Sequence, residues 1–225
     1  MNDDAGWLAS ALGYRFSNED LLAQALTHRS AASRHNERLE YLGDAALGLV
    51  VADALYQRLG EAPEGHLSRL RANLVNRPAL AAMALALGFS ARVRLGSGEL
   101  RSGGFRRESI LADALEAVIG GIYLDGGFEA ARAAVLSLYG ERLDSLPSAE
   151  SLKDPKTRLQ ELLQARGLPL PAYTVELIEG AAHRQTFTVA CAVEGELVPT
   201  MGSGRSRRAA EQAAAAAMLE RFSAA

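Results

Sequence analysis

Hydrophobic and polar residues follow two different patterns along this chain of 225 residues. Up to about residue 145, apolar residues recur at intervals of three and four, as at Leu67, Leu70 and Leu74, and this spacing predicts amphipathic helices. Glycine pairs such as Gly103-Gly104 and Gly126-Gly127 interrupt the runs and predict turns. Because this part shows no strand-like alternation, we expect it to be entirely helical.

The last third of the chain opens with a helix of its own. Asp154-Pro155 is typical of an N-cap followed by proline in the first turn, and it predicts a helix over residues 156–166. The preceding stretch, residues 145–151, lacks periodic apolar positions and predicts a linker. We therefore expect a helical domain over residues 1–146, a linker over 147–153 and a second domain over 154–223.

Two stretches in which apolar and polar residues alternate follow this helix. Apolar positions alternate over residues 173–177 and again over 187–193, which predicts two strands. Glu194-Gly195 predicts a tight turn into a third strand near residues 196–201. An alanine-rich helix over residues 206–222 closes the chain. The expected fold class is therefore multidomain, an all-α domain followed by an α+β domain of order α-β-β-β-α.

Composition narrows the class of protein. With 24 basic and 27 acidic residues the net charge is −3, which does not suggest a basic nucleic-acid coat. Residues 151–225 nevertheless hold 9 basic against 8 acidic residues. A single cysteine excludes an internal disulfide, and the acidic start, Met1 to Asp4, is unlike a signal peptide. Uncharged runs stay shorter than the about 18–20 residues of a membrane span. We expect a cytoplasmic enzyme or binding protein.

Two helical stretches carry acidic residues on one face each. In the first, Glu37, Glu40 and Asp44 are spaced i, i+3 and i+7, which places them on the same side of a helix. In the second, Asp113 and Glu116 are spaced i and i+3. Most acidic pairs with this spacing form a solvated helix face, so their surroundings in the sequence decide the interpretation.

These surroundings are uncharged. Asp44 is the only charged residue over residues 42–52, and Asp113 and Glu116 are the only ones over 110–123. Helices this apolar are normally buried most of the way round. A buried carboxylate must be protonated, paired with a cation or bound to a metal. No Arg or Lys is adjacent, but a basic partner from elsewhere in the chain stays possible.

A divalent cation best explains four converging carboxylates, those of Glu40, Asp44, Asp113 and Glu116. With no His or Cys among them, the oxygen ligands suit Mg²⁺ or Mn²⁺ rather than zinc. A di-iron bundle would need Glu-x-x-His motifs, which are missing. Glu37 is equally well explained by the helix dipole, because it directly follows Asn36, an expected N-cap.

A second candidate site precedes the last helix. The stretch from Gly202 to Ala210 brings glycines, a hydroxyl and three arginines to the point where this helix begins. Backbone N–H groups at a helix start favour phosphate, and arginine side chains add contacts. A basic helix end on a solvated surface is an equally common explanation of such a pattern.

Other features are expected to be structural. Gly120-Gly121 fits close helix packing better than nucleotide binding, because no phosphate-loop spacing surrounds it. Cys191 alternates with apolar residues and is expected to be a core thiol. His28 has no acid placed to complete a nucleophile triad.

Four segments together resemble bacterial ribonuclease III. They are Leu26-Thr27-His28-Arg29-Ser30, Asn36-Glu37-Arg38-Leu39-Glu40-Tyr41-Leu42-Gly43-Asp44-Ala45, Leu70-Arg71-Ala72-Asn73-Leu74-Val75, and Ser109-Ile110-Leu111-Ala112-Asp113 continuing to Glu116. The C-terminal part is similar to the double-stranded-RNA-binding domain of that family. The resemblance implies a homodimeric endoribonuclease that cuts double-stranded RNA with Mg²⁺, or Mn²⁺ in its place, and leaves 5′-phosphate and 3′-hydroxyl ends. It further implies processing of ribosomal RNA precursors and some mRNAs and tRNAs, with no membrane and no small-molecule substrate.

The resemblance also assigns roles to single residues. It implies Glu40, Asp44, Asp113 and Glu116 as metal ligands, with Asp44 and Glu116 the most important for activity, Glu37 as a second-tier residue and Tyr41 at the dimer interface. The RNA contacts that it implies are Thr157, Gln160, Gln164, His183, Arg205, Arg207 and Arg208. Glu211 stands where related domains often have a third basic residue, so it is expected to weaken the basic patch slightly.

Two rival functions stay open. A non-catalytic double-stranded-RNA-binding dimer would use the acids for structure alone, although the intact acidic set argues against it. A Mg²⁺-dependent helical enzyme acting on small diphosphates would leave the second domain unexplained. Mg²⁺-dependent cleavage of a long RNA duplex separates the nuclease from both.

Overall fold

The structure is a computed structural model and describes residues 4–148, 153–182 and 184–224. The chain divides into two compact units, residues 1–146 and 147–225, called unit 1 and unit 2 below. None of the helices in the described ranges is both long and apolar enough to cross a membrane.

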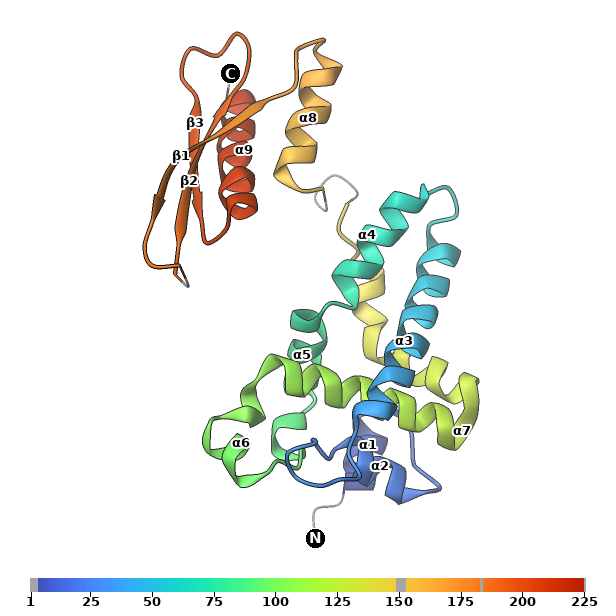
Figure 1. Ribbon diagram of the computed structural model, residues 1–225. Coiled ribbons are helices and arrows are strands. Elements are labelled where there is room, and N and C mark those ends of the chain that lie inside the picture. Colours follow the sequence, from blue (N-terminus) through green and yellow to red (C-terminus); the bar gives the residue numbers. More distant parts are fainter. Residues whose placement is uncertain (1–3, 149–152, 183, 225) are drawn as a thin grey trace. The chain divides into compact units, whose positions relative to one another are not determined.

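Unit 1 is built from helices, as its periodicity predicted (Figure 1). Its one extended pairing among the described residues is an isolated bridge between Thr27 and Arg94. The α-helices are α1 (Asp4–Leu12), α2 (Glu19–Ala25), α3 (Glu37–Arg58), α4 (Glu64–Leu74), α5 (Arg77–Ala86), α6 (Ser97–Arg101) and α7 (Glu108–Asp144). Two short 3-10 helices, η1 (Phe89–Ala91) and η2 (Gly104–Arg106), lie between them.

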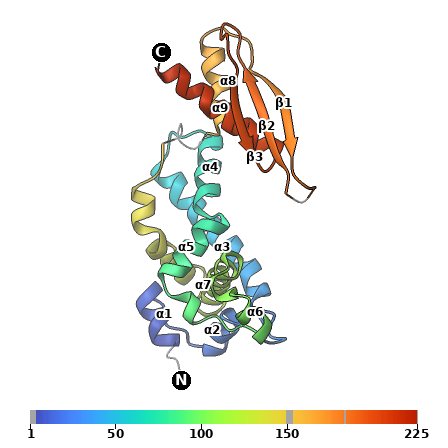
Figure 2. The same ribbon diagram turned by 90° about the vertical axis from the view of Figure 1, so that its left-hand side faces the viewer.

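The first half of α7 forms the centre of unit 1. Almost every residue from Ile110 to Ile122 is buried, and Asp113 and Glu116 are the exceptions within that stretch. Figure 2 shows α7 nearly end-on, between α3 and α5. The prediction that this stretch is buried most of the way round is therefore confirmed.

Glycines let α3 and α7 cross in close contact. A Cβ atom at Gly43 would lie 1.8 Å from the carbonyl oxygen of Glu116, and one at Gly120 would lie 2.1 Å from that of Leu39. Real Cβ atoms cannot approach a backbone oxygen this closely. Close packing, rather than nucleotide binding, therefore explains Gly120.

A break divides α7 after this crossing. Gly127 has φ 80° and ψ −177°, where helical geometry is lost. Just before it, the Asp125 carboxylate accepts hydrogen bonds from the Tyr14 hydroxyl at 2.8 Å and the Ser17 backbone N–H at 2.7 Å. The break predicted at Gly126-Gly127 thus redirects the second half of the helix.

Helix α3 differs from the prediction, because one of its sides is exposed. Tyr41 is 82% exposed, and Ala45, Leu49 and Tyr56 on the same side are exposed as well. The expectation that this apolar helix is buried most of the way round is therefore wrong for the chain by itself. The reason is that α3 packs against α7 and α4 and leaves a side with no cover in the described part of the chain. We call these four residues the α3 stripe.

Unit 2 has the predicted order of helix, three strands and helix. Its elements are α8 (Pro155–Ala165), β1 (Ala172–Glu179), β2 (Thr186–Ala192), β3 (Thr200–Gly204) and α9 (Arg207–Ala224). The strands form an antiparallel sheet of order β1-β2-β3, and both helices lie against the same face of it (Figure 1). Leu159, Leu163, Cys191 and Met218 are fully buried between the layers, so Cys191 is a core thiol as expected.

The third strand begins later than predicted. Residues 196–201 were expected to be extended, but β3 runs from Thr200 to Gly204 and pairs Thr200 with Cys191. A turn does form at Glu194-Gly195, where Gly195 has φ 89°. Beyond it Leu197 is fully exposed, and Pro199 has no N–H to donate to a neighbouring strand. The chain therefore rejoins the sheet only after the proline.

Candidate functional site

Three carboxylates converge where α3 crosses α7. Glu40 of α3 and Asp113 and Glu116 of α7 each offer an oxygen atom, and these atoms lie within 4.8 Å of one another. All three side chains are partly buried. The glycines at the crossing bring the two helices close enough for this contact, so we call these three residues the acid cluster.

The two other predicted acids lie at the edge of this cluster. Asp44 follows Glu40 by one turn of α3 and is exposed, and it is not one of the three converging residues. Glu37 stands in the first turn of α3 and pairs with Arg29 at 3.2 Å. Asn36 is the N-cap residue of α3, but its side chain makes no capping hydrogen bond. The predicted convergence thus applies to three of the four expected ligands.

Burial and mutual repulsion make negative charge costly in the acid cluster. Burial, followed by the charges of Asp44, Glu40 and Asp113, raises the pKa of Glu116 to about 8. Burial and neighbouring acids also raise the pKa of Glu40, and burial is the largest cause of the raised pKa of Asp113. Such carboxylates bind a cation readily, because its positive charge offsets both the cost of burial and the repulsion between the acids.

One arginine from elsewhere in the chain opposes this repulsion. Arg77, the first residue of α5, lowers the pKa values of all three members of the acid cluster by its charge. The sequence left open a basic partner from a distant segment. Arg77 acts on all three acids by its charge, and no salt bridge joins it to them in the described part of the chain. Nothing in the local spacing of the acids indicated it.

A pocket of about 470 Å³ opens beside the acid cluster and is lined by both signs of charge. Its acidic lining includes Glu40 and Asp113. His28, Arg29 and Arg107 bring basic groups to the same pocket. The pocket can thus offer oxygen ligands to a cation and positive groups to an anion.

The basic side chains of this pocket are held by hydrogen bonds and ion pairs. Arg107 Nη1 lies 2.6 Å from Glu99 Oε1, and His28 Nδ1 lies 2.8 Å from Ser30 Oγ. None of these basic residues was predicted to belong to the site. The available signals were the Leu26–Ser30 motif and the position of Arg107 directly before α7.

In unit 2, the first helix presents the predicted polar residues on one side. Thr157, Gln160 and Gln164 are spaced i, i+3 and i+7 on α8, and both glutamines are exposed. Asp154 caps this helix as predicted, since its carboxylate accepts from the Thr157 N–H at 3.0 Å. The Thr157 hydroxyl donates to the same carboxylate at 3.1 Å.

The predicted arginines lie at two places in unit 2. Arg205 lines a pocket of about 530 Å³ with Arg184 of the β1–β2 connection and Thr186 at the start of β2. His183 belongs to that connection but lies outside the described residues. Arg207 and Arg208 begin α9, and Ser206 Oγ accepts from the Ala209 N–H at 3.2 Å in its first turn.

Both units match family models of known proteins. A model of ribonuclease-III-like domains matches residues 18–143, and a model of the double-stranded RNA binding motif matches residues 155–221. Ribonuclease 3 of Vibrio vulnificus is 53% identical over 222 residues, with 99% of each chain covered, and that of Vibrio cholerae is 55% identical over 215 residues, with 96% of each covered. The chain belongs to the ribonuclease III family.

Solved structures agree with this ribonuclease III assignment. The nuclease domain of ribonuclease III from Campylobacter jejuni is 43% identical, with a TM-score of 0.60 over 63% of this chain and 97% of that chain. A second structure of that domain, with a TM-score of 0.59, concerns flexibility in its region of dimer formation. The protein is an endoribonuclease for double-stranded RNA, with the nuclease in unit 1 and the RNA-binding domain in unit 2.

The donor set of this ribonuclease III fits a divalent cation. Carboxylate oxygens are the ligands that Mg²⁺ and Mn²⁺ prefer, and no imidazole or thiol belongs to the converging group. Burial and the neighbouring acids raise the pKa values of Glu116 and Glu40, so a bound cation would stabilise their charged forms. The acid cluster is therefore a candidate location in unit 1 for the metal-dependent chemistry of the ribonuclease III family.

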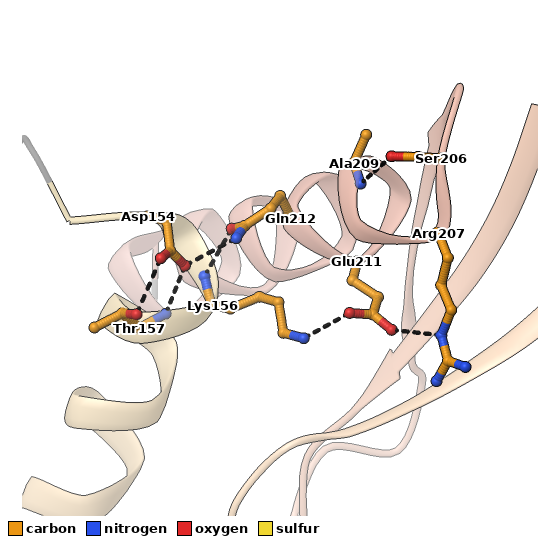
Figure 3. Close-up of polar contacts among 8 residues, drawn as sticks. All are labelled: Asp154, Lys156, Thr157, Ser206, Arg207, Ala209, Glu211 and Gln212. Atoms are coloured by element: carbon orange, nitrogen blue, oxygen red, sulfur yellow. Dashed lines mark hydrogen bonds and ion pairs between the residues drawn. The ribbon is translucent and has the colours of Figure 1, made fainter. Parts of the chain in front are cut away.

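Unit 2 contains a basic residue that the sequence did not single out. Lys156 of α8 reaches Glu211 of α9, with 2.6 Å between Nζ and Oε2, and Arg207 Nε lies 2.8 Å from Oε1 of the same carboxylate (Figure 3). Lys156 is thereby held near the arginines that begin α9. Because 55 residues separate Lys156 from Glu211, no local pattern could have shown this contact.

Proposed function

We propose that Glu40, Asp44, Asp113 and Glu116 hold Mg²⁺, or Mn²⁺ in its place, and that this site hydrolyses phosphodiester bonds of double-stranded RNA to leave 5′-phosphate and 3′-hydroxyl ends. The observation that carries the proposal is the convergence of three carboxylates beside a pocket that also holds arginines. Asp44 completes the set from the exposed side of α3, one turn beyond Glu40.

In unit 1 the acidic residues bind the cation and the basic residues attract the phosphates of the RNA. The acid cluster binds and orients the cation, and Asp44 and Glu116 contribute most to activity. A bound divalent cation lowers the pKa of coordinated water and neutralises charge on the leaving oxygen. Arg29 and Arg107, each held by a glutamate, attract the RNA backbone into the pocket. Glu37 supports the site by holding Arg29 rather than as a metal ligand.

Unit 2 supplies affinity for the duplex. Thr157, Gln160 and Gln164 contact the minor groove from α8, His183 and Arg205 contact the duplex at the β1–β2 connection, and Arg207 and Arg208 bind phosphates at the start of α9. Domains of this kind recognise A-form geometry, 2′-hydroxyls and phosphates with little base specificity. The exposed glutamines of α8 and the arginines that begin α9 support these roles.

Two copies of the chain form the working enzyme. Tyr41, which is 82% exposed on the α3 stripe, packs against the partner copy. In the dimer each copy cuts one strand of the duplex. The C. jejuni nuclease domain has a region of dimer formation, and this chain resembles it closely enough to expect the same assembly. Substrates are ribosomal RNA precursors and some mRNAs and tRNAs, and the enzyme acts in the cytoplasm.

The proposed metal site is tested by replacing one carboxylate. Glu116→Gln should abolish Mg²⁺-dependent cleavage of a long RNA duplex, because the amide removes a charge that the cation needs. It should still bind the duplex in a gel-shift assay. Glu129→Gln is the matched control, since Glu129 is an exposed residue of α7 outside the pocket, and it should cut normally. Cleavage by Glu116→Gln at the wild-type rate, or cleavage by the wild type in excess EDTA, would contradict the proposal.

A further inference from the structure

Glu211 is an acidic residue of unit 2 that lies between two basic residues, Lys156 and Arg207, which with Arg208 we call the basic surface of unit 2. It lies one turn into α9, and its side chain is only 12% exposed. By charge alone it should repel RNA and weaken the neighbouring arginines. Its contacts indicate a different role.

The two oxygens of the Glu211 carboxylate hold two cations from different helices. One oxygen accepts from Arg207 Nε at 2.8 Å, within α9, and the other accepts from Lys156 Nζ at 2.6 Å, across from α8 (Figure 3). Lys156 Nζ also lies 4.5 Å from the centre of the Tyr173 ring. The ammonium group of Lys156 is thus held by a carboxylate and an aromatic face together.

The geometry leaves Arg207 able to bind phosphate. Glu211 contacts Nε, so the two terminal nitrogens of the guanidinium are not used by this ion pair. The Arg207 side chain is 65% exposed, whereas Glu211 is largely covered. The largely buried Glu211 carboxylate therefore holds the Arg207 guanidinium at Nε and leaves its two terminal nitrogens free to face the solvent.

A second contact fixes the two helix starts relative to each other. Gln212, the next residue of α9, donates to Asp154 Oδ1 at 2.9 Å and accepts from the Lys156 N–H at 3.1 Å. Figure 3 shows these contacts beside those of Glu211. The start of α8 and the first turns of α9 are joined here by hydrogen bonds, which place Lys156 and Arg207 close to each other.

We propose that Glu211 is a positioning residue for RNA binding, which orders the side chains of Arg207 and Lys156 so that both meet phosphates of the duplex. Long, flexible basic side chains lose conformational freedom when they bind, and a side chain that is already ordered loses less. The proposal requires this gain to exceed the repulsion between RNA and one largely covered negative charge. The inference rests on the proposed contact of Arg207 with RNA.

The sign of one substitution tests the proposal. Glu211→Gln removes a negative charge from an RNA-binding surface, so a purely electrostatic role predicts tighter binding. Positioning predicts the opposite, a loss of roughly two- to tenfold in affinity, the cost of ordering one flexible side chain at an interface. The full chain is titrated, with EDTA present, against an RNA duplex longer than the about 16 base pairs that such a domain spans. Equal or tighter binding by a folded Glu211→Gln variant overturns the proposal.

A double substitution shows whether the effect acts through Arg207. Arg207→Ala should weaken binding strongly in the wild type and much less in the Glu211→Gln background, because the arginine is no longer ordered there. Arg208→Ala, at the adjacent exposed residue, should cost the same in both backgrounds. Equal costs of Arg207→Ala in the two backgrounds would refute a positioning role. In cleavage assays Glu211→Gln should raise KM and leave kcat unchanged.

A surface variant keeps the test decisive even if Glu211→Gln does not fold. Arg207→Lys keeps the charge, but its single ammonium group would be taken up by Glu211 instead of binding phosphate. We expect Arg207→Lys to bind almost as weakly as Arg207→Ala, and wild-type affinity of Arg207→Lys would overturn the proposal. If neither Arg207→Ala nor Arg208→Ala weakened binding, the RNA contacts of α9 would fail as well. If Arg207→Ala and Arg208→Ala weakened binding while Arg207→Lys did not, the role of Glu211 alone would be refuted.

Discussion

Glu116 lies where burial and neighbouring charges both oppose its ionisation. Asp44 and Glu40 from α3 and Asp113 from its own helix surround it, and Arg77 offsets them in part. The resulting pKa of about 8 means that, without a cation, this carboxyl group is largely protonated at neutral pH. A divalent cation must therefore displace a proton when it binds, which makes metal affinity rise with pH.

The first prediction concerns the stability of the metal-free protein. The pKa of Glu116 in the folded chain is raised above its ordinary value of 4.5, so the folded state holds this proton more tightly than the unfolded state. The stability that the proton contributes is complete below about pH 4.5 and is lost as the pH rises through about 8. With EDTA present, the Tm of unit 1 should therefore fall between about pH 6 and about pH 9.

Trp7 makes this measurement specific to unit 1. It is the single tryptophan of the chain and lies in α1, so its fluorescence follows the unfolding of unit 1. Glu116→Gln should reduce the decline in Tm without removing it, because the pKa values of Glu40 and Asp113 are raised too. Added Mg²⁺ should raise the Tm more at high pH than at low pH. A Tm that rises with pH in EDTA would contradict this account.

At the scale of elements, the crossing of α3 and α7 decides the geometry of the acid cluster. Gly43 and Gly120 bring the helix backbones into contact, Glu40 and Glu116 lie about one turn from these glycines, and Asp113 lies one turn before Glu116. A glycine normally weakens a helix, so its presence at both positions of the crossing indicates that closeness is worth more here than helix propensity. The spacing of the acid cluster follows directly from this contact.

The second prediction tests this crossing. Gly43→Ala would place a methyl group 1.8 Å from the carbonyl oxygen of Glu116, so the helices must separate. We expect a loss of about 1–3 kcal/mol in the free energy of unfolding of unit 1, typical of overpacked cores, together with weaker cleavage. Denaturant titration followed by Trp7 fluorescence measures the former, and a duplex cleavage assay measures the latter.

Gly140→Ala is the matched control for Gly43→Ala. Gly140 lies within α7, and a Cβ atom there would have no neighbour within 4 Å. Alanine should stabilise the helix by about 0.5–1 kcal/mol through its higher helix propensity, with no change in cleavage. If both variants behaved alike, close packing at Gly43 would not be what holds the acid cluster together.

At the scale of the whole molecule, the distribution of charge explains a net charge that looked unfavourable for RNA binding. The total of −3 includes the acidic residues of unit 1 that are proposed to be offset by a bound cation. In unit 2, Glu211 lies among the basic residues that begin α9 and is itself paired with two cations. Affinity for RNA therefore depends on where the charges lie rather than on their sum.

The third prediction concerns assembly through the α3 stripe. Tyr41→Ala should leave the fold of unit 1 intact, because the side chain is 82% exposed within one chain. It should weaken the homodimer on the order of tenfold or more, as removal of a central interface tyrosine does. Sedimentation velocity over a range of protein concentrations measures the change. Leu197→Ala, at a fully exposed apolar residue of unit 2, should leave assembly unchanged.

A dimer of Tyr41→Ala as stable as that of the wild type would place the interface elsewhere. In that case the α3 stripe would need a different explanation. If the dimer does weaken, cleavage of both strands in one binding event should decline with it, since each copy is proposed to cut one strand.

Much of the local structure could be predicted from the sequence. The helical spacing of unit 1 and the alternation in unit 2 indicated the element types, because each depends on residues only a few positions apart. The start of β3 was predicted too early, and the cause is again local. Pro199 has no N–H to donate, so pairing with β2 begins at Thr200 and not directly after the Glu194-Gly195 turn. The pairing of acids on one helix face was equally visible, because i, i+3 spacing fixes it.

The sequence by itself determined which helices carry carboxylates, where glycines permit close approach, and which family motifs are present. Only the tertiary structure decided that Glu40, Asp113 and Glu116 converge, that Arg77 opposes their repulsion, and that one side of α3 is left without cover. It also decided that Glu211 holds Lys156, a residue 55 positions away. The physical reason is that these contacts depend on how closely packed elements cross, which the periodicity of a single element does not specify.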